Sequence, residues 1–362
     1  MVTKNKLPNP LFWKNKKVLV TGHTGFKGSW LSIWLSTLGA NIVGFSEKPP
    51  TTPSLFHEAK INTFVDSIIG DIRDKNLLES CIKKSNPDII FHMAAQSLVR
   101  ESYSRPLETY EVNVLGTLNL LEAVRKSETV KALINVTSDK CYKNIETLSG
   151  YKETDELGGK DPYSNSKACS ELISQSYRDS FFSNDEFKAY IATARSGNVI
   201  GGGDWSEERL IPDIIRSITS KKLLMVRNSS AIRPWQHVLD PLNGYLTLIE
   251  NLYKNGPTYI GAWNFGPLKS DEKSVGSILK YFSNYFDGLT YQDNNKELFH
   301  ETKVLKLDSS KSREKLGWNT LLSIHDSLNL TCNWYKHYLE NPSKIKNITL
   351  DQIDSFIKLA HE

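Results

Sequence analysis

The sequence of 362 residues predicts an α/β fold, namely a doubly wound parallel sheet with a smaller, interleaved C-terminal region. Three observations predict it. Short, continuously apolar runs recur through the first half, which indicates strands covered on both faces. Amphipathic segments lie between these runs and predict crossover helices. A glycine-rich turn joins the first apolar run to the first amphipathic segment, where such folds pass from strand to helix.

The individual elements can be placed on the chain. The predicted strands are residues 17–21, 42–45, 88–93, 132–136 and 190–194, with one further strand before Gly70. Two apolar stripes at helical spacing predict helices. The first is Trp30, Leu31, Trp34, Leu35 and Leu38, ended by Gly39, and the second is Val112, Leu115, Leu118, Leu121 and Val124. After Gly197 the pattern becomes irregular, and we expect a substrate-capping region there.

Composition excludes several classes of protein. The net charge is +4 and no run of five basic residues occurs, so neither nucleic acid nor an anionic membrane is an expected partner. Four widely separated cysteines without a CxxC pair argue against a disulfide framework or a zinc site, and we expect no metal. No stretch reaches the roughly 18 apolar residues that span a bilayer. The sequence therefore predicts a cytoplasmic globular protein.

The glycine-rich turn predicts a phosphate cradle. Gly22, Gly25 and Gly28 follow a G-x-x-G-x-x-G spacing between the first strand and the first helix. The first glycine permits the turn, the second lets the backbone approach a pyrophosphate, and the third allows close helix packing. The positive end of the helix dipole attracts the phosphates. An ordinary tight turn is the alternative interpretation. The order Lys-Gly-Ser excludes a Walker loop.

The end of the second strand favours NAD as the dinucleotide. An acidic residue normally binds the adenosine ribose there, whereas this chain has Ser46 followed by Glu47. No arginine stands nearby to hold a 2′-phosphate, which favours NAD over NADP. Asp71, after the third strand, could face the adenine amine or could be an ordinary turn carboxylate.

One tyrosine has the spacing of a catalytic base. Of the 15 tyrosines, only Tyr163 has a lysine four residues later, Lys167, which places both on one helix face. A nearby ammonium lowers the pKa of a phenol from its reference value of about 10. Tyr163 could then accept a hydroxyl proton while hydride leaves the same carbon. The alternative is a core tyrosine beside an exposed lysine.

A polar segment follows the strand before that helix. Ser138, Asp139 and Lys140 come directly after residues 132–136, and ligands of parallel sheets bind at such carboxyl ends. Ser138 could hydrogen-bond the reacting alcohol. Asp139 and Lys140 add a proton donor and acceptor that simple alcohol oxidation does not require. The alternative is a solvated ion pair at a strand end.

Together these motifs resemble the extended short-chain dehydrogenase/reductase superfamily over nearly the whole chain. Longer segments are similar to its sugar-nucleotide 4,6-dehydratases that act on CDP-glucose: residues 21–30, 138–142, 197–205 and 233–241. The resemblance implies a Rossmann domain that binds NAD and oxidation at C4 of the glucose with Tyr163, Ser138 and Lys167. Asp139 would protonate the departing C6 hydroxyl, and hydride would return to C6. The product would be CDP-4-keto-6-deoxyglucose, a precursor of deoxyhexoses in surface polysaccharides such as the O antigen of lipopolysaccharide.

The resemblance also implies further site residues. Catalytic roles would fall to Ser138, Asp139, Lys140, Tyr163 and Lys167, and substrate contacts to Asn198, Arg209 and Arg233. Cofactor contacts would come from Gly22, Thr24, Gly25, Phe26, Gly28, Ser46, Asp71, Ile72, Ala94, Ala95, Gln96, Asn113, Tyr163 and Lys167. Related dehydratases carry glutamate, the C5 base, where this chain has Lys140. A neutral Lys140 could be the base, or a protonated one could stabilise the enolate.

The same resemblance predicts the domain organisation. The NAD-binding domain would comprise residues 14–197 and 231–266, and the substrate domain residues 198–230 and 267–345. Residues 346–362 would form a peripheral helical tail, and the protein would be a homo-oligomer, either dimer or tetramer. Two rival functions remain at this stage. One is another NAD-dependent sugar-nucleotide dehydratase or a 4-epimerase, and the other is a non-catalytic NAD-binding sensor, against which the complete Ser138, Tyr163 and Lys167 set argues.

Overall fold

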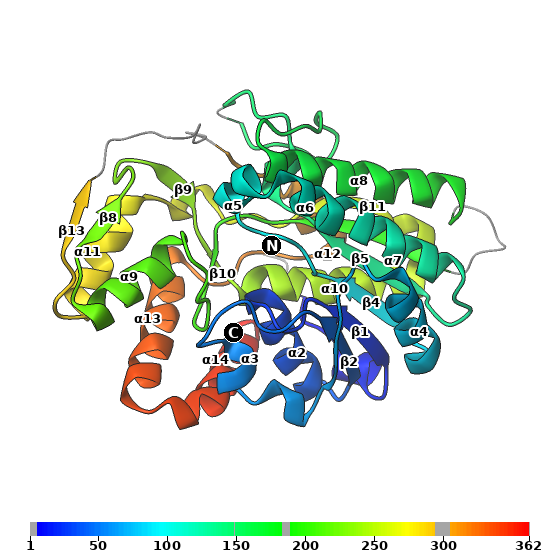
Figure 1. The fold of residues 1–362 in the computed structure, drawn as a ribbon, viewed down its shortest axis with the longest axis horizontal. Helices are drawn as coiled ribbons and strands as arrows, with labels where there is room; N and C mark the ends of the chain where they lie inside the picture. Colours follow the sequence, from blue (N-terminus) through cyan, green and yellow to red (C-terminus); the bar gives the residue numbers. More distant parts are fainter. Residues whose placement is uncertain (1–5, 148, 183–188, 294–304, 362) are drawn as a thin grey trace.

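A computed structural model describes residues 6–147, 149–182, 189–293 and 305–361. Residues 294–304 of the predicted substrate domain and Glu362 of the predicted tail lie outside the described residues. Seven parallel strands form the central sheet in the order β11-β6-β5-β4-β1-β2-β3 (Figure 1). Their bounds are β1 Lys17–Thr21, β2 Asn41–Ser46, β3 Asp66–Ile69, β4 Ile89–His92, β5 Ala132–Val136, β6 Tyr190–Arg195 and β11 Gly261–Asn264.

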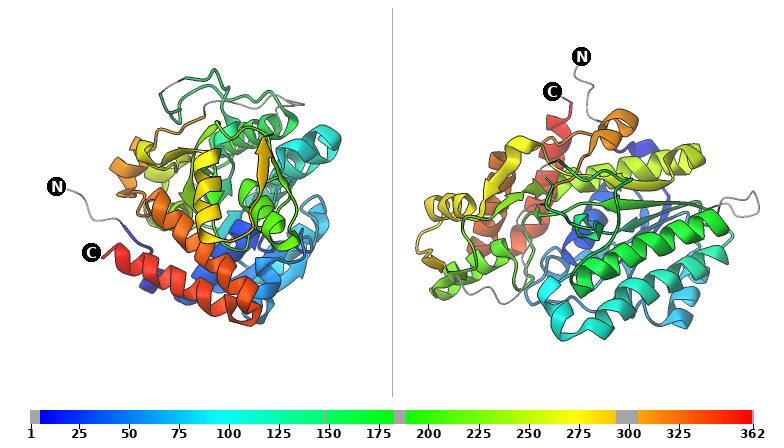
Figure 2. Two further views of the ribbon diagram at one scale, coloured as in Figure 1. Left: turned by 90° about the vertical axis from the view of Figure 1, so that its left-hand side faces the viewer. Right: turned by 90° about the horizontal axis from the view of Figure 1, so that it is seen from above.

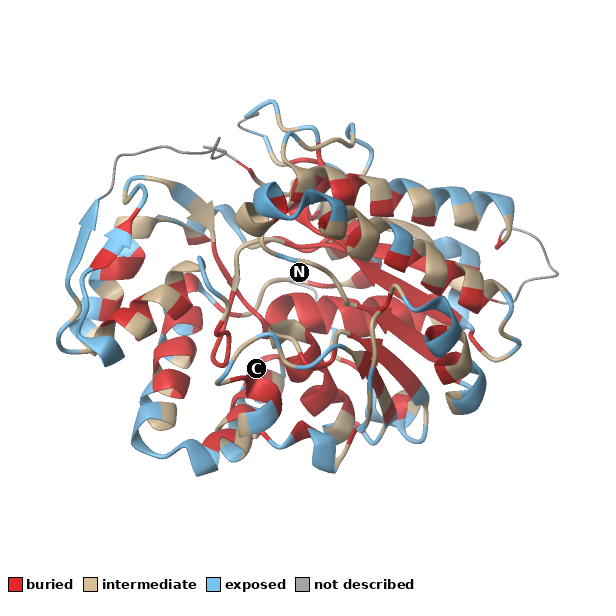
Figure 3. Ribbon diagram, in the orientation of Figure 1, coloured by how far each residue is buried: buried red, intermediate tan, exposed pale blue. Residues whose placement is uncertain are grey.

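The apolar runs form strands because both faces of the sheet are covered. In β1, Val18 and Val20 join the core on one face, whereas Leu19 between them joins the core on the other. Figure 3 shows the central strands coloured as buried along their length. A strand buried on both sides has no polar face, and this explains the continuous apolar runs. The predicted fold class, all five predicted strand runs and the further strand before Gly70 are confirmed.

Helices cover the two faces of the sheet. On one face lie α2 (Phe26–Thr37) and α10 (Leu239–Asn255), and on the other lie α4 (Lys75–Ser85), α7 (Gly116–Arg125) and α8 (Pro162–Ser180). The view from above shows α7 and α8 side by side (Figure 2). The predicted helix at Trp30 is confirmed as α2, and Gly39 follows its end in the left-handed region with φ +80°.

The second predicted stripe is only partly right. Leu121 and Val124 are buried in α7, but the side chain of Leu115 is 51% exposed. A π-helical turn, η2 (Glu111–Leu115), precedes α7 and takes more residues per turn than an α-helix. The buried residues Asn113, Thr117, Leu120 and Val124 nevertheless keep regular helical spacing across this turn. The predicted stripe stepped by three residues each time and therefore drifted around the helix, which leaves Leu115 on the exposed side.

A smaller lobe stands beside the carboxyl ends of the strands (Figure 1). It contains three two-stranded sheets and the helices α9 (Leu210–Ser220), α11 (Val275–Tyr285) and α13 (Ile324–Glu340). The strand pairs are β7 Val199–Ile200 with β10 Gln236–His237, β8 Leu224–Val226 with β13 Tyr291–Asp293, and β9 Ile232–Pro234 with β12 Glu272–Ser274. Because α10 and β11 return to the main sheet, this lobe is interleaved with it. The exact domain boundaries stay predictions.

The remaining helices are short, with the exception of α14 (Ile345–Leu359). This last helix packs against α2 and α13, where the Phe356 ring lies edge-on to Trp34 at 5.6 Å between centroids. Its residues therefore join the main core. The short helices are α1 Pro10–Trp13, α3 Leu55–Glu58, α5 Val99–Ser104, α6 Pro106–Tyr110, α12 Ser310–Leu316, η1 Ile61–Thr63, η3 Asp139–Cys141, η4 Gly256–Tyr259, η5 Lys269–Asp271 and η6 Pro342–Lys344.

The strand order places a ligand site. The chain leaves β3 at one edge of the sheet and crosses to β4, on the other side of β1. Helices before and after this reversal cover opposite faces, so a crevice opens at the carboxyl ends of β1 and β4. Within the described parts of the chain, no helix has the length and apolarity to cross a bilayer.

Candidate active site

A cavity of about 1030 Å³ opens at this crevice and extends toward the smaller lobe. Its walls bring together residues far apart in the sequence. Of the predicted site residues, the lining includes Gly22, Thr24, Gly25, Phe26, Gly28, Ser46, Asp71, Ile72, Ala94, Ala95, Gln96, Ser138, Asp139, Lys140, Tyr163, Lys167, Asn198, Arg209 and Arg233. The cavity thus joins the predicted cofactor, reaction and substrate regions.

Asn113 is the predicted site residue that does not line the cavity. It is buried on η2, where its side chain accepts from the Gln96 amide (2.9 Å) and donates to the Gln96 carbonyl (3.0 Å). Its amide also donates to the Ser166 hydroxyl at 2.9 Å. Asn113 therefore ties the segment after β4 to α8, which carries Tyr163, and acts on the cavity through these neighbours.

The phosphate cradle has the close packing that its glycines predict. Gly22 has φ +75°, and its amide and the Thr21 side chain hold the ends of β1 and β2 together with the segment after β4. A Cβ on Gly28 would overlap the carbonyl oxygen of Gly22 and lie 2.8 Å from its carbonyl carbon. A Cβ on Gly25 would meet only that oxygen, at 3.4 Å. The second glycine therefore faces open space, whereas the third is closed in by backbone.

Beyond the cradle, hydroxyl and carboxylate groups line the far end of the cavity. The Thr24 hydroxyl lies 2.8 Å from the Ser46 hydroxyl and donates to the Glu47 carbonyl at 3.0 Å. Asp71 accepts hydrogen bonds from the guanidinium and from the backbone amide of Arg73, and these lower the pKa of its carboxyl. Arg73 also pairs with Glu111 at 3.2 Å. Arg73, which sequence reasoning had overlooked, is thus engaged by two carboxylates, whereas Lys48 lines the cavity beside Glu47.

The reaction centre lies where β5 ends. Ser138 caps the short helix η3, accepts from the Lys140 amide at 3.2 Å and donates to Asp139 at 3.0 Å. Asp139 is buried against Gly197, where any Cβ would overlap its carboxylate. Lys140 is half-buried on the cavity wall. The carboxyl end of β5 therefore presents the side chains of three consecutive residues, Ser138, Asp139 and Lys140, to the cavity.

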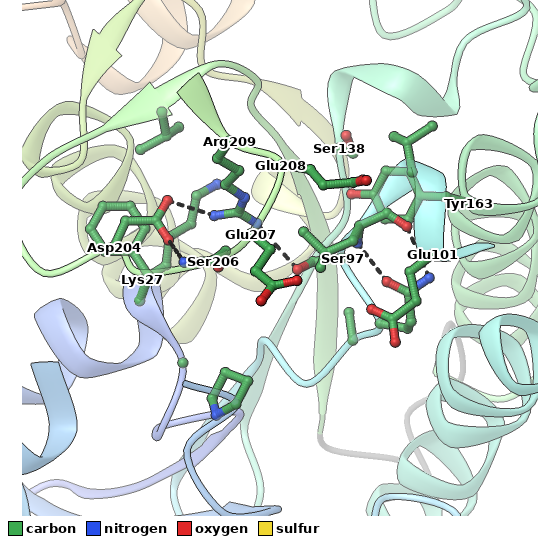
Figure 4. A pocket seen from close by; sticks show the side chains of 18 of the residues that line it. Lys27, Ser97, Glu101, Ser138, Tyr163, Asp204, Ser206, Glu207, Glu208 and Arg209 are labelled. Atoms are coloured by element: carbon green, nitrogen blue, oxygen red, sulfur yellow. Dashed lines mark hydrogen bonds and ion pairs between the residues drawn. The ribbon is translucent and has the colours of Figure 1, made fainter. Parts of the chain in front are cut away.

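Tyr163 reaches this strand end from α8. Asp161 caps the helix by accepting from the Ser164 amide at 2.9 Å, and Pro162 takes the first position, where no amide donor is needed. The Tyr163 amide donates to the Ser102 hydroxyl on α5 at 3.1 Å. These contacts fix the first turn of α8 against the cavity, and Tyr163 and Ser138 lie together at one end of it (Figure 4).

The electrostatics differ from the prediction. Burial raises the pKa of Tyr163 to about 12, and the two largest opposing influences are a hydrogen bond with Ser138 and the charge of Arg209. The predicted influence was Lys167, but its ammonium donates to the Val136 carbonyl at 3.4 Å. Burial also lowers the pKa of Lys167 to about 8, and Glu171 partly opposes this. Desolvation thus outweighs the neighbouring cation.

Three polar residues of the cavity, namely Lys27, Ser97 and Asp204, were missed as site residues. Two of them contact Arg209, which was predicted. Arg209 pairs with Asp204 at 2.9 Å and donates to the Ser97 hydroxyl at 3.2 Å (Figure 4). Lys27, within the cradle, donates to the Ser196 hydroxyl at 2.9 Å. Burial, followed by Arg209, lowers the pKa of Lys27 to about 7. A lysine inside a glycine turn was a visible signal for Lys27, whereas nothing local pointed to Asp204 or Ser97.

Two substrate candidates lie on the side of the smaller lobe. Asn198 has φ +50°, and its carbonyl accepts from the Gln236 amide at 3.2 Å. Arg233 lies on β9, next to Trp235, whose indole donates to the Lys273 carbonyl at 3.0 Å. Within the described ranges, no three histidine, cysteine or acidic side chains gather in a way that could hold a metal ion.

A family model, a relative and a solved structure to which the chain is similar all concern nucleotide-sugar 4,6-dehydratases. Residues 19–331 match the family model described as GDP-mannose 4,6 dehydratase. The chain is 46% identical over 343 residues to a CDP-glucose 4,6-dehydratase of Salmonella typhimurium, with 94% of each chain covered. It is 25% identical to a CDP-paratose 2-epimerase of Salmonella typhi over 88% of this chain and 98% of that one. The solved structure of DesIV, a dTDP-glucose 4,6-dehydratase from Streptomyces venezuelae, shares the fold, with a TM-score of 0.77, 23% identity and coverage of 91% and 99%.

Proposed function

The chain belongs to the GDP-mannose 4,6 dehydratase family, and from this premise we propose that it converts CDP-glucose to CDP-4-keto-6-deoxyglucose. Its activity is that of a sugar-nucleotide 4,6-dehydratase, a hydro-lyase. One observation carries the proposal. A single cavity holds Tyr163, which accepts a hydroxyl proton, and Asp139, which gives one to a departing hydroxyl. A 4-epimerase needs the first group but not the second.

NAD fits the cradle. Gly25 leaves room for a pyrophosphate, and the amide end of α2 offers it a positive dipole. Thr24 and Ser46 present hydroxyls toward the ribose end. Arg73 is paired with Asp71 and Glu111, which favours NAD over its 2′-phosphorylated form. When bound, NAD supplies the hydride acceptor for C4 and the hydride donor for C6.

The chain's own residues handle the protons. Tyr163 accepts the C4 hydroxyl proton as general base, with Ser138 hydrogen-bonded to it and Lys167 one turn along α8. The 4-keto group acidifies the C5 proton, and Lys140 takes part in its removal, either as base or by stabilising the enolate. Asp139 protonates the hydroxyl that leaves C6. Water exclusion favours each step, because Ser138, Asp139, Tyr163 and Lys167 are all buried.

Substrate binding involves the smaller lobe. Arg233 and Arg209 offer forked donors suited to a pyrophosphate, and Asn198 lines the same cavity. The exposed side chains of Leu107, Leu115 and Leu172 lie on α6, η2 and α8, which pack together, and they support the proposed homo-oligomer. We place the reaction in the cytoplasm, where its product would feed deoxyhexose synthesis for surface polysaccharide.

A panel of nucleotide sugars tests the proposal. Purified protein with NAD is incubated with CDP-, dTDP- and UDP-glucose and with GDP-mannose. We expect CDP-glucose to lose one water by mass and to give the alkaline chromophore of a 4-keto sugar, with kcat/KM at least about tenfold above the others. A 4-epimer as product, or preference for another nucleotide, would reject the assignment.

Two glycine variants separate cofactor binding from folding. Gly28→Ala places a Cβ against the Gly22 backbone, and we expect a loss of about 1–3 kcal/mol in the free energy of unfolding. Gly25→Ala places its Cβ toward the pyrophosphate, so we expect unchanged unfolding but a Kd for NAD raised about tenfold or more. Denaturant titration and calorimetry measure the two effects. Equal NAD affinity in Gly25→Ala would contradict the cradle.

A further inference from the structure

The proposed reaction leaves the enzyme with a proton imbalance. Hydride leaves C4 and returns to C6 within one turnover, and C5 loses one proton and regains one. The proton of the C4 hydroxyl, however, passes to Tyr163 and is not returned to the sugar. The oxygen that leaves C6 needs one proton to depart as water. Each turnover therefore adds a proton at Tyr163 and consumes one at Asp139.

Bulk water is poorly placed to correct this imbalance. Tyr163 is 7% exposed and Asp139 is 4% exposed. Asp139 is further enclosed by Gly197, and its amide is directed at the Ser196 carbonyl at 3.4 Å. A path through the protein would avoid waiting for solvent at each of the two sites.

Ser138 occupies the position of such a path. Its hydroxyl donates to the Asp139 carboxylate at 3.0 Å, and the Tyr163 phenol lies at the same end of the cavity, close enough for Ser138 to lower its pKa (Figure 4). A hydroxyl has one donor and two acceptor positions. The Lys140 amide fills one acceptor position at 3.2 Å, which leaves the second for the phenol. The Ser138 hydroxyl is thus hydrogen-bonded to the carboxylate on one side and has an acceptor position free for the phenol on the other.

We propose that Ser138 relays to Asp139 the proton that Tyr163 takes from the sugar, a role that rests on the proposed function. The phenol O–H bond breaks as Ser138 gains that proton, and the original Ser138 O–H bond breaks as Asp139 gains its proton. Asp139 passes it to the oxygen leaving C6, and the C6–O bond breaks. Tyr163 ends as phenolate and Asp139 as carboxylate, ready for the next sugar.

Acidity sets the direction and the timing of the relay. Tyrosine and aspartic acid have reference pKa values of about 10 and 3.9, so a phenol does not spontaneously protonate a carboxylate. Burial moves the pKa of Tyr163 further up, to about 12. Water has a pKa of about 15.7, so hydroxide leaving C6 is the stronger base. The transfer is therefore downhill only while the C6–O bond breaks, and it requires that C4 has already been oxidised.

A substrate with another leaving group isolates the relay. In CDP-6-deoxy-6-fluoroglucose, fluoride departs from C6 without needing a proton, whereas oxidation at C4 is unchanged. We expect Ser138→Ala to lose about 10²-fold or more in kcat on CDP-glucose. On the fluoro substrate we expect its loss to be at least about tenfold smaller. Asp139→Asn should show the same selective rescue, and Ser138→Thr, which keeps the hydroxyl, should approach the wild type on both substrates.

Absorbance at 340 nm gives a second readout. If the relay is lost, C4 is still oxidised but elimination is slow, so reduced nicotinamide should accumulate in Ser138→Ala during the first turnover. If Ser138→Ala does not fold, Ser138→Cys takes its place, because cysteine keeps the volume of the side chain. Equal losses on the two substrates would overturn the relay and confine Ser138 to contact with the C4 hydroxyl. A wild-type enzyme that leaves CDP-glucose unchanged would instead overturn the proposed function.

Discussion

Replacing Tyr163 with phenylalanine should lower kcat on CDP-glucose by about 10²–10⁴-fold, the usual contribution of a positioned general base. The phenol is the titratable group beside Ser138 at the reaction end of the cavity. Its pKa is raised to about 12, so the phenolate fraction of the free enzyme increases with pH. The wild type should therefore gain kcat/KM as the pH rises, and the variant should lose this dependence. Steady-state rates below about pH 8, where Lys167 keeps its proton, measure both effects.

Tyr110→Phe is the matched control. Its hydroxyl donates to Asn165 on α8 at 3.0 Å, but Tyr110 is not among the cavity's lining residues. This variant also removes one hydroxyl that contacts the same helix, and we expect its kcat to stay within about twofold of the wild type. Full turnover by Tyr163→Phe, or an equal loss in Tyr110→Phe, would contradict the role of Tyr163 as base.

The sequence predicted those features that depend on local pattern. Five strand runs were found because a strand covered on both faces must be apolar throughout. The spacing of Tyr163 and Lys167 and the position of Ser138 after β5 led directly to one cavity. These features need only the strand-to-helix order and the rule that ligands bind at carboxyl ends.

Features that depend on distant contacts were harder to predict. Leu115 is exposed because the buried face of this helix runs through Asn113, Thr117 and Leu120, and a polar residue at Asn113 hid that face from the apolar pattern. The pKa of Tyr163 rises because burial outweighs nearby charge, and burial is a property of the assembled fold. Arg209 lies near Tyr163 although 46 positions separate them in the sequence, and only the fold brings Ser97 and Asp204 to its guanidinium.

The second large effect concerns an ion pair beneath the reaction centre. Glu171 follows Lys167 on α8 at the same four-residue spacing that separates Lys167 from Tyr163. Its carboxylate accepts from Arg195 at 2.9 and 2.8 Å and from the Thr193 hydroxyl at 2.7 Å, and it also accepts from Thr137. Both charged side chains are 3% exposed. Glu171 thus joins α8 to β6 and to the end of β5, and its charge opposes the lowering of the Lys167 pKa by burial.

Glu171→Gln should therefore destabilise the protein strongly. Arg195 would keep its charge in the interior without a counter-ion, and breaking a buried pair in this way costs about 3–5 kcal/mol. The loss of negative charge should also lower the pKa of Lys167 below its present value of about 8. Lys167 would then lose its proton at lower pH, so the alkaline limb of the rate profile should move to lower pH. Urea unfolding and the pH dependence of kcat measure the two effects.

Replacing both partners separates the two effects. Glu171→Leu with Arg195→Met leaves no unpaired charge, and such apolar replacements of buried pairs are often neutral. We expect the double variant to regain most of the lost stability. Because it still lacks the Glu171 charge, its alkaline limb should lie between those of Glu171→Gln and the wild type. The contradicting result is a double variant that regains stability while the alkaline limb stays at its wild-type pH in both variants. Glu171 would then be a structural residue without influence on Lys167.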